Sequence, residues 1–99
     1  MKKNDPDLQT KIAILIPVFN GIEFTKKCLD NLQKITDNKG YNITLIVIDD
    51  GSKDGTSQWI EENHQDVVVL KGDGNLWWSG GINKGLQYAF RELKAEYVL

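Results

Sequence analysis

The segment Ile46–Thr56, with the sequence IVIDDGSKDGT, joins an apolar run to two adjacent carboxylates and a turn that contains glycine. The run that leads into it, Ile43–Ile48, is almost continuously apolar, which is typical of a strand buried on both faces of a sheet. Asp49 and Asp50 then stand at the carboxyl end of that strand. Because ligands of open α/β sheets bind outside the carboxyl ends of the strands, this segment predicts a binding site.

Strands and helices are expected to alternate along the chain, which predicts an α/β fold with three α/β/α layers and a mostly parallel sheet. The loops Pro17–Gly21, Asp49–Gly55 and Lys71–Gly81 then leave the sheet on the same side and line one pocket. The other expected strands are Ile12–Ile16, which Pro17 ends, Val67–Leu70, and a strand that starts at Tyr97–Leu99. A first helix is expected to end in Asp37–Gly40 and a second to span Thr56–Asn63. The apolar face of the first helix consists of Phe24, Cys28, Leu29, Leu32 and Ile35, and that of the last helix of Ile82, Leu86, Ala89, Phe90 and Leu93.

Length and charge restrict the function. The 99 residues form one small domain, and a net charge of −2 with scattered lysines argues against nucleic acid as a partner. The single Cys28 excludes an internal disulfide and is predicted to be a buried core thiol in a reducing compartment. No apolar run reaches the roughly 20 residues of a membrane span. We expect residues 1–10 to be a flexible tail, residues 11–99 to form the domain, and the protein to be cytoplasmic, without a membrane span.

The side chains at the predicted strand ends suggest different roles. Asp49 and Asp50 can accept hydrogen bonds from a base imide or a ribose hydroxyl, or approach a metal. Ser52 and Asp54, together with Thr56, are better suited to capping the helix that opens at Thr56, because short oxygen-bearing side chains accept from free N–H groups. By the same reasoning, Asn20 is a candidate cap for the helix that follows it.

The glycine-rich loop before the last predicted helix is a second candidate contact to an anion. Its glycines, from Gly72 to Gly81, allow the backbone to approach a ligand closely, and N–H groups at a helix start favour a diphosphate. Trp77 and Trp78 cannot both point inward, so one of them is a candidate to stack on a base or sugar; packing in the core or an interface is the alternative.

The same region also matches a calcium-binding loop of the EF-hand type at residues 50–61. Its ligand and turn positions fall on Asp50, Ser52, Asp54, Gly55, Thr56, Gln58 and Glu61. Against this alternative, an EF-hand loop follows a helix, whereas the preceding residues predict a strand.

Three blocks together resemble family 2 glycosyltransferases of GT-A fold, in their amino-terminal half. They are Ile16–Gly21 (IPVFNG), Val47–Thr56 (VIDDGSKDGT) and Gly74–Gly85 (GNLWWSGGINKG). The third block is most similar to rhamnosyltransferase-type members that build bacterial surface polysaccharides. The resemblance implies a Rossmann-like nucleotide-binding half with strand order three-two-one-four. It also implies an inverting enzyme whose donor is a UDP-, dTDP- or GDP-linked sugar, with Mn or Mg as the metal.

The resemblance also implies site residues. Pro17, Phe19 and Asn20 would border the base and ribose, Asp49 or Asp50 would accept from them, and the segment Asn75–Gly81 would run beside the diphosphate. Ile82 occupies a position where the family commonly has an arginine, which leaves the diphosphate charge to a metal and other groups. The nucleotide-binding residues expected in this way are Pro17, Phe19, Asn20, Asp49, Asp50, Ser52, Asn75, Trp78, Gly80 and Gly81.

The family's remaining machinery is expected elsewhere. Its Asp-x-Asp metal motif would follow Leu99, and its catalytic carboxylate would lie in the second half, so the chain is expected to hold neither a catalytic nor a metal-binding residue. The isolated chain is therefore predicted to be a truncated donor-binding half that is inactive and self-associates through an incomplete sheet edge. The complete enzyme is expected in the cytoplasm or at a membrane surface. A non-catalytic nucleotide-binding or interaction module is the alternative function.

Overall fold

The computed structural model describes residues 10–36 and 41–99, with the side chains at positions 35, 36, 77 and 78 excepted. The predicted tail (1–9) and helix end (37–40) therefore lie outside the described residues, but Thr10, assigned to the tail, begins the first strand. In chain order the elements are β1 (Thr10–Val18), α1 (Ile22–Thr36), β2 (Tyr41–Asp49), α2 (Thr56–Asn63), β3 (Val68–Lys71), α3 (Trp77–Arg91) and β4 (Tyr97–Val98).

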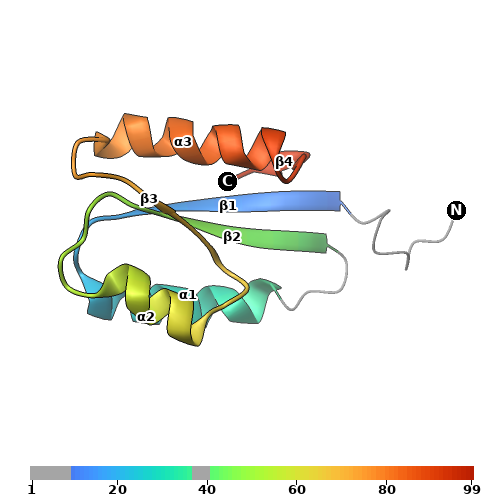
Figure 1. Ribbon diagram of the computed structural model, residues 1–99. Helices are drawn as coiled ribbons and strands as arrows, with labels where there is room; N and C mark the ends of the chain where they lie inside the picture. Colours follow the sequence, from blue (N-terminus) through green and yellow to red (C-terminus); the bar gives the residue numbers. More distant parts are fainter. Residues whose placement is uncertain (1–9, 37–40) are drawn as a thin grey trace, which may run out of the picture.

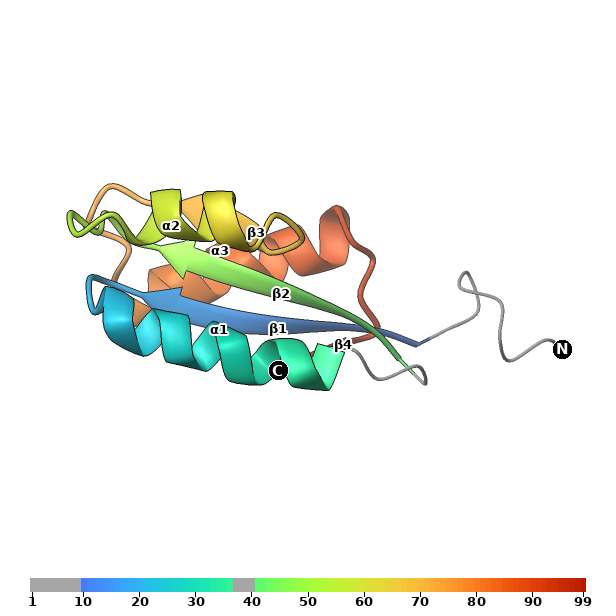
Figure 2. The same ribbon diagram turned by 90° about the horizontal axis from the view of Figure 1, so that it is seen from below.

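The four strands form one parallel sheet in the order β3-β2-β1-β4. This confirms the strand order that the family resemblance implied. β1 and β2 pair along their full length, from Thr10 opposite Tyr41 to Val18 opposite Asp49. α3 covers one face of the sheet, and α1 and α2 cover the other (Figures 1 and 2). The predicted three-layer α/β/α fold is confirmed.

Alternate residues of β2 supply the two sides of the core. Ile46 and Ile48 pack on the α3 side, together with Ala89 of that helix. Leu45 and Val47 point to the opposite side and pack with Leu29 of α1 and Ile60 of α2. All of these side chains are buried. A strand with both faces covered needs a continuous apolar run, which is what the sequence pattern of β2 predicted.

Pro17 lies inside β1, opposite Ile48, so the prediction that it ends the strand is wrong. The hydrogen bonds of its neighbour explain why. The N–H of Leu15 donates to the carbonyl of Leu99 beside β4, and N–H groups two residues apart in a strand point the same way. The N–H that Pro17 lacks would therefore point away from β2, and no bond between β1 and β2 is lost.

α3 begins at Trp77, so the predicted glycine-rich loop is shorter than expected and Gly80 and Gly81 are helical. The line of this helix that faces the sheet is made of small residues, Gly81, Gly85 and Ala89, each buried and four positions apart. A Cβ on Gly85 would lie 3.0 Å from side-chain carbons of both Ile48 and Leu15. Close packing against the sheet thus requires glycine at position 85. Phe90 was predicted to lie on the apolar face of this helix, but it is 54% exposed, so that part of the prediction is wrong.

The predicted apolar face of α1 is rotated from the buried one. Thr25 and Leu29 are buried, whereas Phe24 is 83% exposed and Cys28 is also exposed, so the prediction of a buried core thiol is wrong. Neighbouring residues of a helix differ in direction by about 100°, so burying Thr25 and Leu29 turns the residues just before them outward. The hydroxyl of Thr25 tolerates burial because it donates to the carbonyl of Gly21.

Substitution of Gly80 and Gly85, two of the glycines of α3, by alanine is expected to have opposite effects. At Gly80 the new Cβ would meet Leu76 at an ordinary 3.5 Å, so Gly80→Ala should stabilise the fold by about 0.5–1 kcal/mol through helix propensity. Gly85→Ala must displace core side chains and should destabilise it by about 1 kcal/mol despite the same propensity gain. Urea denaturation of both variants measures the difference; equal free energies of unfolding would contradict the close packing of α3.

Candidate functional site

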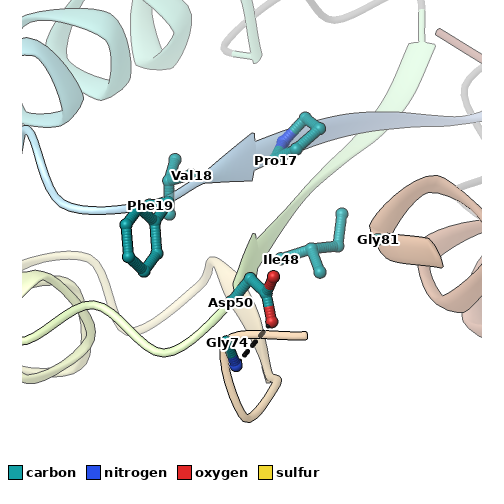
Figure 3. Close-up of a pocket in the computed structure, with 7 residues that line it drawn as sticks. All are labelled: Pro17, Val18, Phe19, Ile48, Asp50, Gly74 and Gly81. Carbon is teal, nitrogen blue, oxygen red and sulfur yellow. Dashed lines mark hydrogen bonds between the residues drawn. The ribbon is translucent and has the colours of Figure 1, made fainter. Parts of the chain in front are cut away.

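A pocket of about 440 Å³ opens where the loops after β1, β2 and β3 meet at the carboxyl edge of the sheet. Its walls are mostly apolar, and one carboxylate, that of Asp50, faces it. In Figure 3, Phe19 from the end of β1 and Asp50 from the end of β2 stand at neighbouring strand ends, and Gly81 of α3 lies on the side away from Phe19. The lining residues are Pro17, Val18, Phe19, Ile48, Asp50, Gly74 and Gly81.

Asp50 fixes the loop between β3 and α3. Its Oδ1 accepts the N–H of Gly74 at 2.8 Å, and its Oδ2 accepts the N–H of Leu76 at 3.0 Å (Figure 3 shows the first of these bonds). Leu76 is the residue that precedes α3, so this carboxylate caps the helix from another part of the chain. A negative charge is favourable at a helix N-terminus, where N–H groups have no partner within the helix.

Asp49, the other carboxylate of the pair, is 3% exposed and organises its own turn. Its Oδ1 accepts the N–H of Ser52 at 2.9 Å, and its Oδ2 accepts the hydroxyl of Ser57 in α2. The alternation of side chains along β2 explains the different roles, because adjacent residues at the end of a strand point to opposite sides. Of the two carboxylates between which the sequence could not choose, Asp50 is the one that lines the pocket.

The loop after β1 is bound to the loop after β2 by three reciprocal hydrogen bonds, which we call the β1–β2 latch. The N–H of Asn20 donates to Oγ of Ser52 at 2.6 Å, and Oδ1 of Asn20 accepts the N–H of Lys53 at 2.9 Å. The N–H of Ile22, the first residue of α1, donates to Oδ2 of Asp54 at 3.0 Å. Asn20 was predicted to cap α1, but Asp54 caps it instead, across a separation of 32 residues.

Asp54 uses its second oxygen at the start of α2. Its Oδ1 accepts both the N–H and the hydroxyl of Thr56, which confirms the prediction of a helix-capping role for Asp54. The hydroxyl of Thr56 holds the pKa of Asp54 below its ordinary value; the N–H groups of Ile22 and Thr56 act in the same direction, and desolvation opposes them. The carboxylate is therefore charged whenever the pH is above its ordinary pKa of 3.8.

Gly51 allows the loops after β2 and β3 to touch. It has a φ of +83°, and a Cβ there would lie 2.9 Å from the backbone nitrogen of Gly74. Gly55 in the same loop has a similar φ of +84°, but no atom lies within 4 Å of its Cβ position. Gly51 is thus required by both conformation and space, and Gly55 by conformation alone.

The nucleotide-binding residues expected from the sequence fall into two groups in the structure. Four of them, Pro17, Phe19, Asp50 and Gly81, line the pocket. The others lie around it. Asn20 and Ser52 belong to the β1–β2 latch, and Asp49 accepts hydrogen bonds within its own turn. Asn75 is exposed and donates its N–H to Asp73, Gly80 faces Leu76, and Trp78 lies in the first turn of α3, where its side chain is outside the described part.

Three lining residues were missing from the sequence prediction: Val18, Ile48 and Gly74. Val18 belongs to the segment Pro17–Gly21, which was predicted to line the pocket as a loop, but it was not named as a site residue. Ile48 was assigned only to an apolar strand run, although it stands next to predicted site residues at a strand end. Gly74 lies within the third quoted block, and its φ of +97° marks it as a turn position. An apolar strand end beside a carboxylate is therefore the pattern that identifies such pocket walls.

The carboxylates of the EF-hand alternative do not converge on a cation. Asp50 accepts from the loop before α3, Asp54 accepts from the starts of α1 and α2, and Glu61 pairs with Lys71 at 2.9 Å. Across residues 10–36 and 41–99, no group of three or more His, Cys, Asp or Glu side chains is arranged to hold a metal ion. The predicted calcium loop is wrong, because residues 56–61 belong to α2.

Comparison with known proteins identifies the fold. Residues 13–99 match the model of Glycosyl transferase family 2. The chain belongs to this family. Since the match covers all three strand-end loops, the pocket of this family 2 domain lies wholly within the matched region.

Several glycosyltransferases are similar to this family 2 domain. An uncharacterized glycosyltransferase of Rickettsia typhi is 30% identical over 89 residues, which cover 87% of this chain and 24% of the relative. The poly(ribitol-phosphate) beta-glucosyltransferase of Bacillus spizizenii is 33% identical over 92 residues, 90% of this chain and 14% of the relative. The domain thus spans about a quarter or less of the length of these relatives.

The fold is also that of a solved glycosyltransferase. A mannosyltransferase from Pyrobaculum calidifontis, in complex with GDP-Man and Mn²⁺, superimposes with a TM-score of 0.67 over 87% of this chain and 26% of its own, at 22% identity. This likeness establishes the GT-A-type fold.

In the part of the family 2 domain that the structure describes, no helix has the length and apolar character needed to cross a membrane.

Alanine substitutions at Gly51 and Gly55 are expected to separate conformational strain from steric conflict. Both variants force alanine into the left-handed region, and Gly55→Ala should cost only that strain, about 1–2 kcal/mol. Gly51→Ala also displaces the backbone of Gly74 and should lower the free energy of unfolding by about 3 kcal/mol. Thermal and urea denaturation of the two variants provide the measurement; equal losses would show that the two loops do not need close contact.

Acidification is expected to release the start of α1 from Asp54. Because the pKa of Asp54 is lowered by folding, its contribution to stability is present above the ordinary carboxyl pKa of 3.8 and is lost as the pH falls through the lower, folded value. The amide resonance of Ile22 in ¹⁵N-resolved NMR spectra should shift in that acidic range. The same titration of Asp54→Asn is the control, in which the Ile22 resonance should no longer shift in this range; a pH-dependent shift as large as that of wild type would refute the assignment.

Proposed function

We propose that this family 2 domain binds the nucleotide part of a sugar-nucleotide donor in the pocket between the three strand-end loops. The observation that carries this proposal is the position of the pocket at the carboxyl ends of β1 and β2, where open α/β folds bind ligands. The pocket combines apolar walls with a few polar groups, as sites for small organic ligands do. The relation to a mannosyltransferase solved with GDP-Man supports a nucleotide sugar as the ligand class.

The lining residues suit the base and ribose. Phe19 is 63% exposed at the edge of the pocket and offers a ring face on which a base can stack. Asp50 offers the one carboxylate among the lining residues, and Pro17 and Gly81 supply walls without bulky polar groups. We assign base and ribose recognition to these four residues, and assign to Asn20, Asp49 and Ser52 the positioning of the loops around them.

The negative charge of a diphosphate at this site must be neutralised by a cation. The N–H groups of Gly74 and Leu76 donate to Asp50, so a diphosphate placed beside Asn75–Gly81 would lie near a carboxylate. A divalent cation that binds with the donor supplies the neutralising charge in metal-dependent transfer. The described residues hold no cluster of three or more His, Cys, Asp or Glu side chains for such a metal. The family resemblance supports metal ligands that follow Leu99.

We further propose that the domain is the donor-binding part of an inverting glycosyltransferase and is inactive alone. Its small share of the length of the relatives supports a division of labour in which other parts supply the acceptor site and the catalytic base. The similarity to an enzyme named for poly(ribitol phosphate) supports a role in bacterial surface polysaccharide synthesis. Self-association through the β1 edge stays a prediction.

A nucleotide-binding screen tests the proposal. Isothermal titration of the 99-residue chain with UDP, GDP and dTDP, each with and without Mn²⁺ or Mg²⁺, should show saturable binding of at least one nucleotide. Absence of binding to all three would refute the proposed function. Turnover of a nucleotide sugar by this chain would refute its inactivity.

Phe19 and Phe24 provide a matched pair for this test. Both rings are exposed and lie close together in sequence, but only Phe19 is a lining residue. Phe19→Ala should weaken nucleotide binding by about 1–3 kcal/mol through loss of stacking, whereas Phe24→Ala should leave the dissociation constant unchanged. If the two variants bind alike, the base does not stack on Phe19.

A further inference from the structure

The carboxylate of Asp54 joins the starts of two helices without lining the pocket itself. One oxygen accepts the N–H of Ile22 at 3.0 Å, and the other accepts from Thr56, a residue with no exposed surface. Thr56 is anchored in the core, so the carboxylate is held firmly at the α2 end. The α1 end of the bridge is where the loop after β1 re-enters regular structure.

The loop that Asp54 holds has an unfavourable backbone. Asn20 has a φ of +56° and Gly21 a φ of +72°, so two consecutive residues occupy the left-handed region. Asparagine tolerates this conformation better than most residues, but it persists only where surrounding contacts require it. The β1–β2 latch supplies those contacts, since Ser52 and Lys53 bind Asn20, and Asp54 binds Ile22 directly after the two left-handed residues.

The side chain that depends on this loop is Phe19. It is 63% exposed and directly precedes the left-handed pair, so packing against the core contributes little to its position. Its ring direction therefore follows the backbone of residues 19–22. Figure 3 shows this ring among the side chains that line the pocket. A change in the backbone at Ile22 would move the ring relative to the pocket.

We infer that Asp54 is a positioning residue for the nucleotide pocket. By accepting the N–H of Ile22 within the β1–β2 latch, it fixes the backbone of residues 19–22 and thereby the direction of the Phe19 ring. This inference rests on the proposed function for its binding consequence, but its structural part stands independently. It assigns a role in ligand recognition to a carboxylate whose hydrogen-bond partners, Ile22 and Thr56, do not line the pocket. Ser52 has the same role at the other end of the left-handed pair.

Two variants and one control test the inference. Asp54→Asn keeps the shape of the side chain, but its NH₂ group cannot accept the N–H of Ile22 while its oxygen accepts from Thr56. Ser52→Ala removes the acceptor for Asn20 and leaves the cap of α2 intact, so it answers the case in which Asp54→Asn folds poorly. Asp66→Asn is the control, because Asp66 is a loop carboxylate that also binds α1, through Gln33 near the other end of the helix.

The first measurement follows the Phe19 ring itself. In the chain labelled with fluorophenylalanine, the ¹⁹F resonance of Phe19 is assigned with Phe19→Leu and recorded for each variant at neutral pH. Asp54→Asn and Ser52→Ala should shift or broaden this resonance, and the resonances of Phe24 and Phe90 should keep their positions in Ser52→Ala. Asp66→Asn should leave all three unchanged.

The second measurement is the affinity for the nucleotide that wild type binds best, at a temperature where every variant is fully folded. Asp54→Asn and Ser52→Ala should raise the dissociation constant by about three- to tenfold, whereas Asp66→Asn should not change it. A role confined to stability would lower the melting temperature and leave both the Phe19 resonance and the affinity unchanged, which would overturn the inference.

The two proposals fail in different ways. If wild type binds no nucleotide but the Phe19 resonance moves in both variants, the proposed function fails and the positioning of Phe19 by Asp54 stands. If wild type binds a nucleotide and the Phe19 resonance is the same in all variants, the inference fails and the proposed function stands.

Discussion

The site depends on the hydrogen bonds that side-chain oxygens of the β2–α2 loop accept from backbone N–H groups of the two loops beside it. β2 is an inner strand with β1 on one side and β3 on the other, so the loop after it lies between the other two. Ser52 and Asp54 bind the loop after β1, and Asp50 binds the loop after β3. Backbone bonds join the three loops at the strand ends, and these side-chain acceptors add the bonds that hold the loops together farther along.

These bonds also show that the carboxylates of this loop, which suggested ligand binding in the sequence, stabilise the starts of the helices. Each of the three helices has a carboxylate oxygen at its amino-terminal end: α1 and α2 share Asp54, and α3 has Asp50. Free N–H groups and the helix dipole both favour a negative charge at this place. These carboxylates keep their charge, but their oxygens already accept backbone N–H groups, so Phe19 and the apolar walls determine much of what the pocket accepts.

Features set by local pattern were predictable from the sequence, and features set by distant partners were not. The apolar run of β2 and the bounds of α2 follow from short segments, and the strand order followed from the family resemblance. The buried face of α1 was misjudged because Thr25 is buried in place of Phe24, which only packing decides. The start of α3 was missed because its cap comes from Asp50, 26 residues earlier.

Pro17 gives the pocket one more property. The strand order reverses between β1 and β4, since β2 and β3 lie on one side of β1 and β4 on the other. Next to this reversal, Pro17 presents no N–H on the β4 side, so β1 has no unsatisfied donor there. A strand beside it can therefore diverge from β1 without leaving a buried N–H at Pro17 unpaired, and the floor of the pocket can widen between β1 and β4.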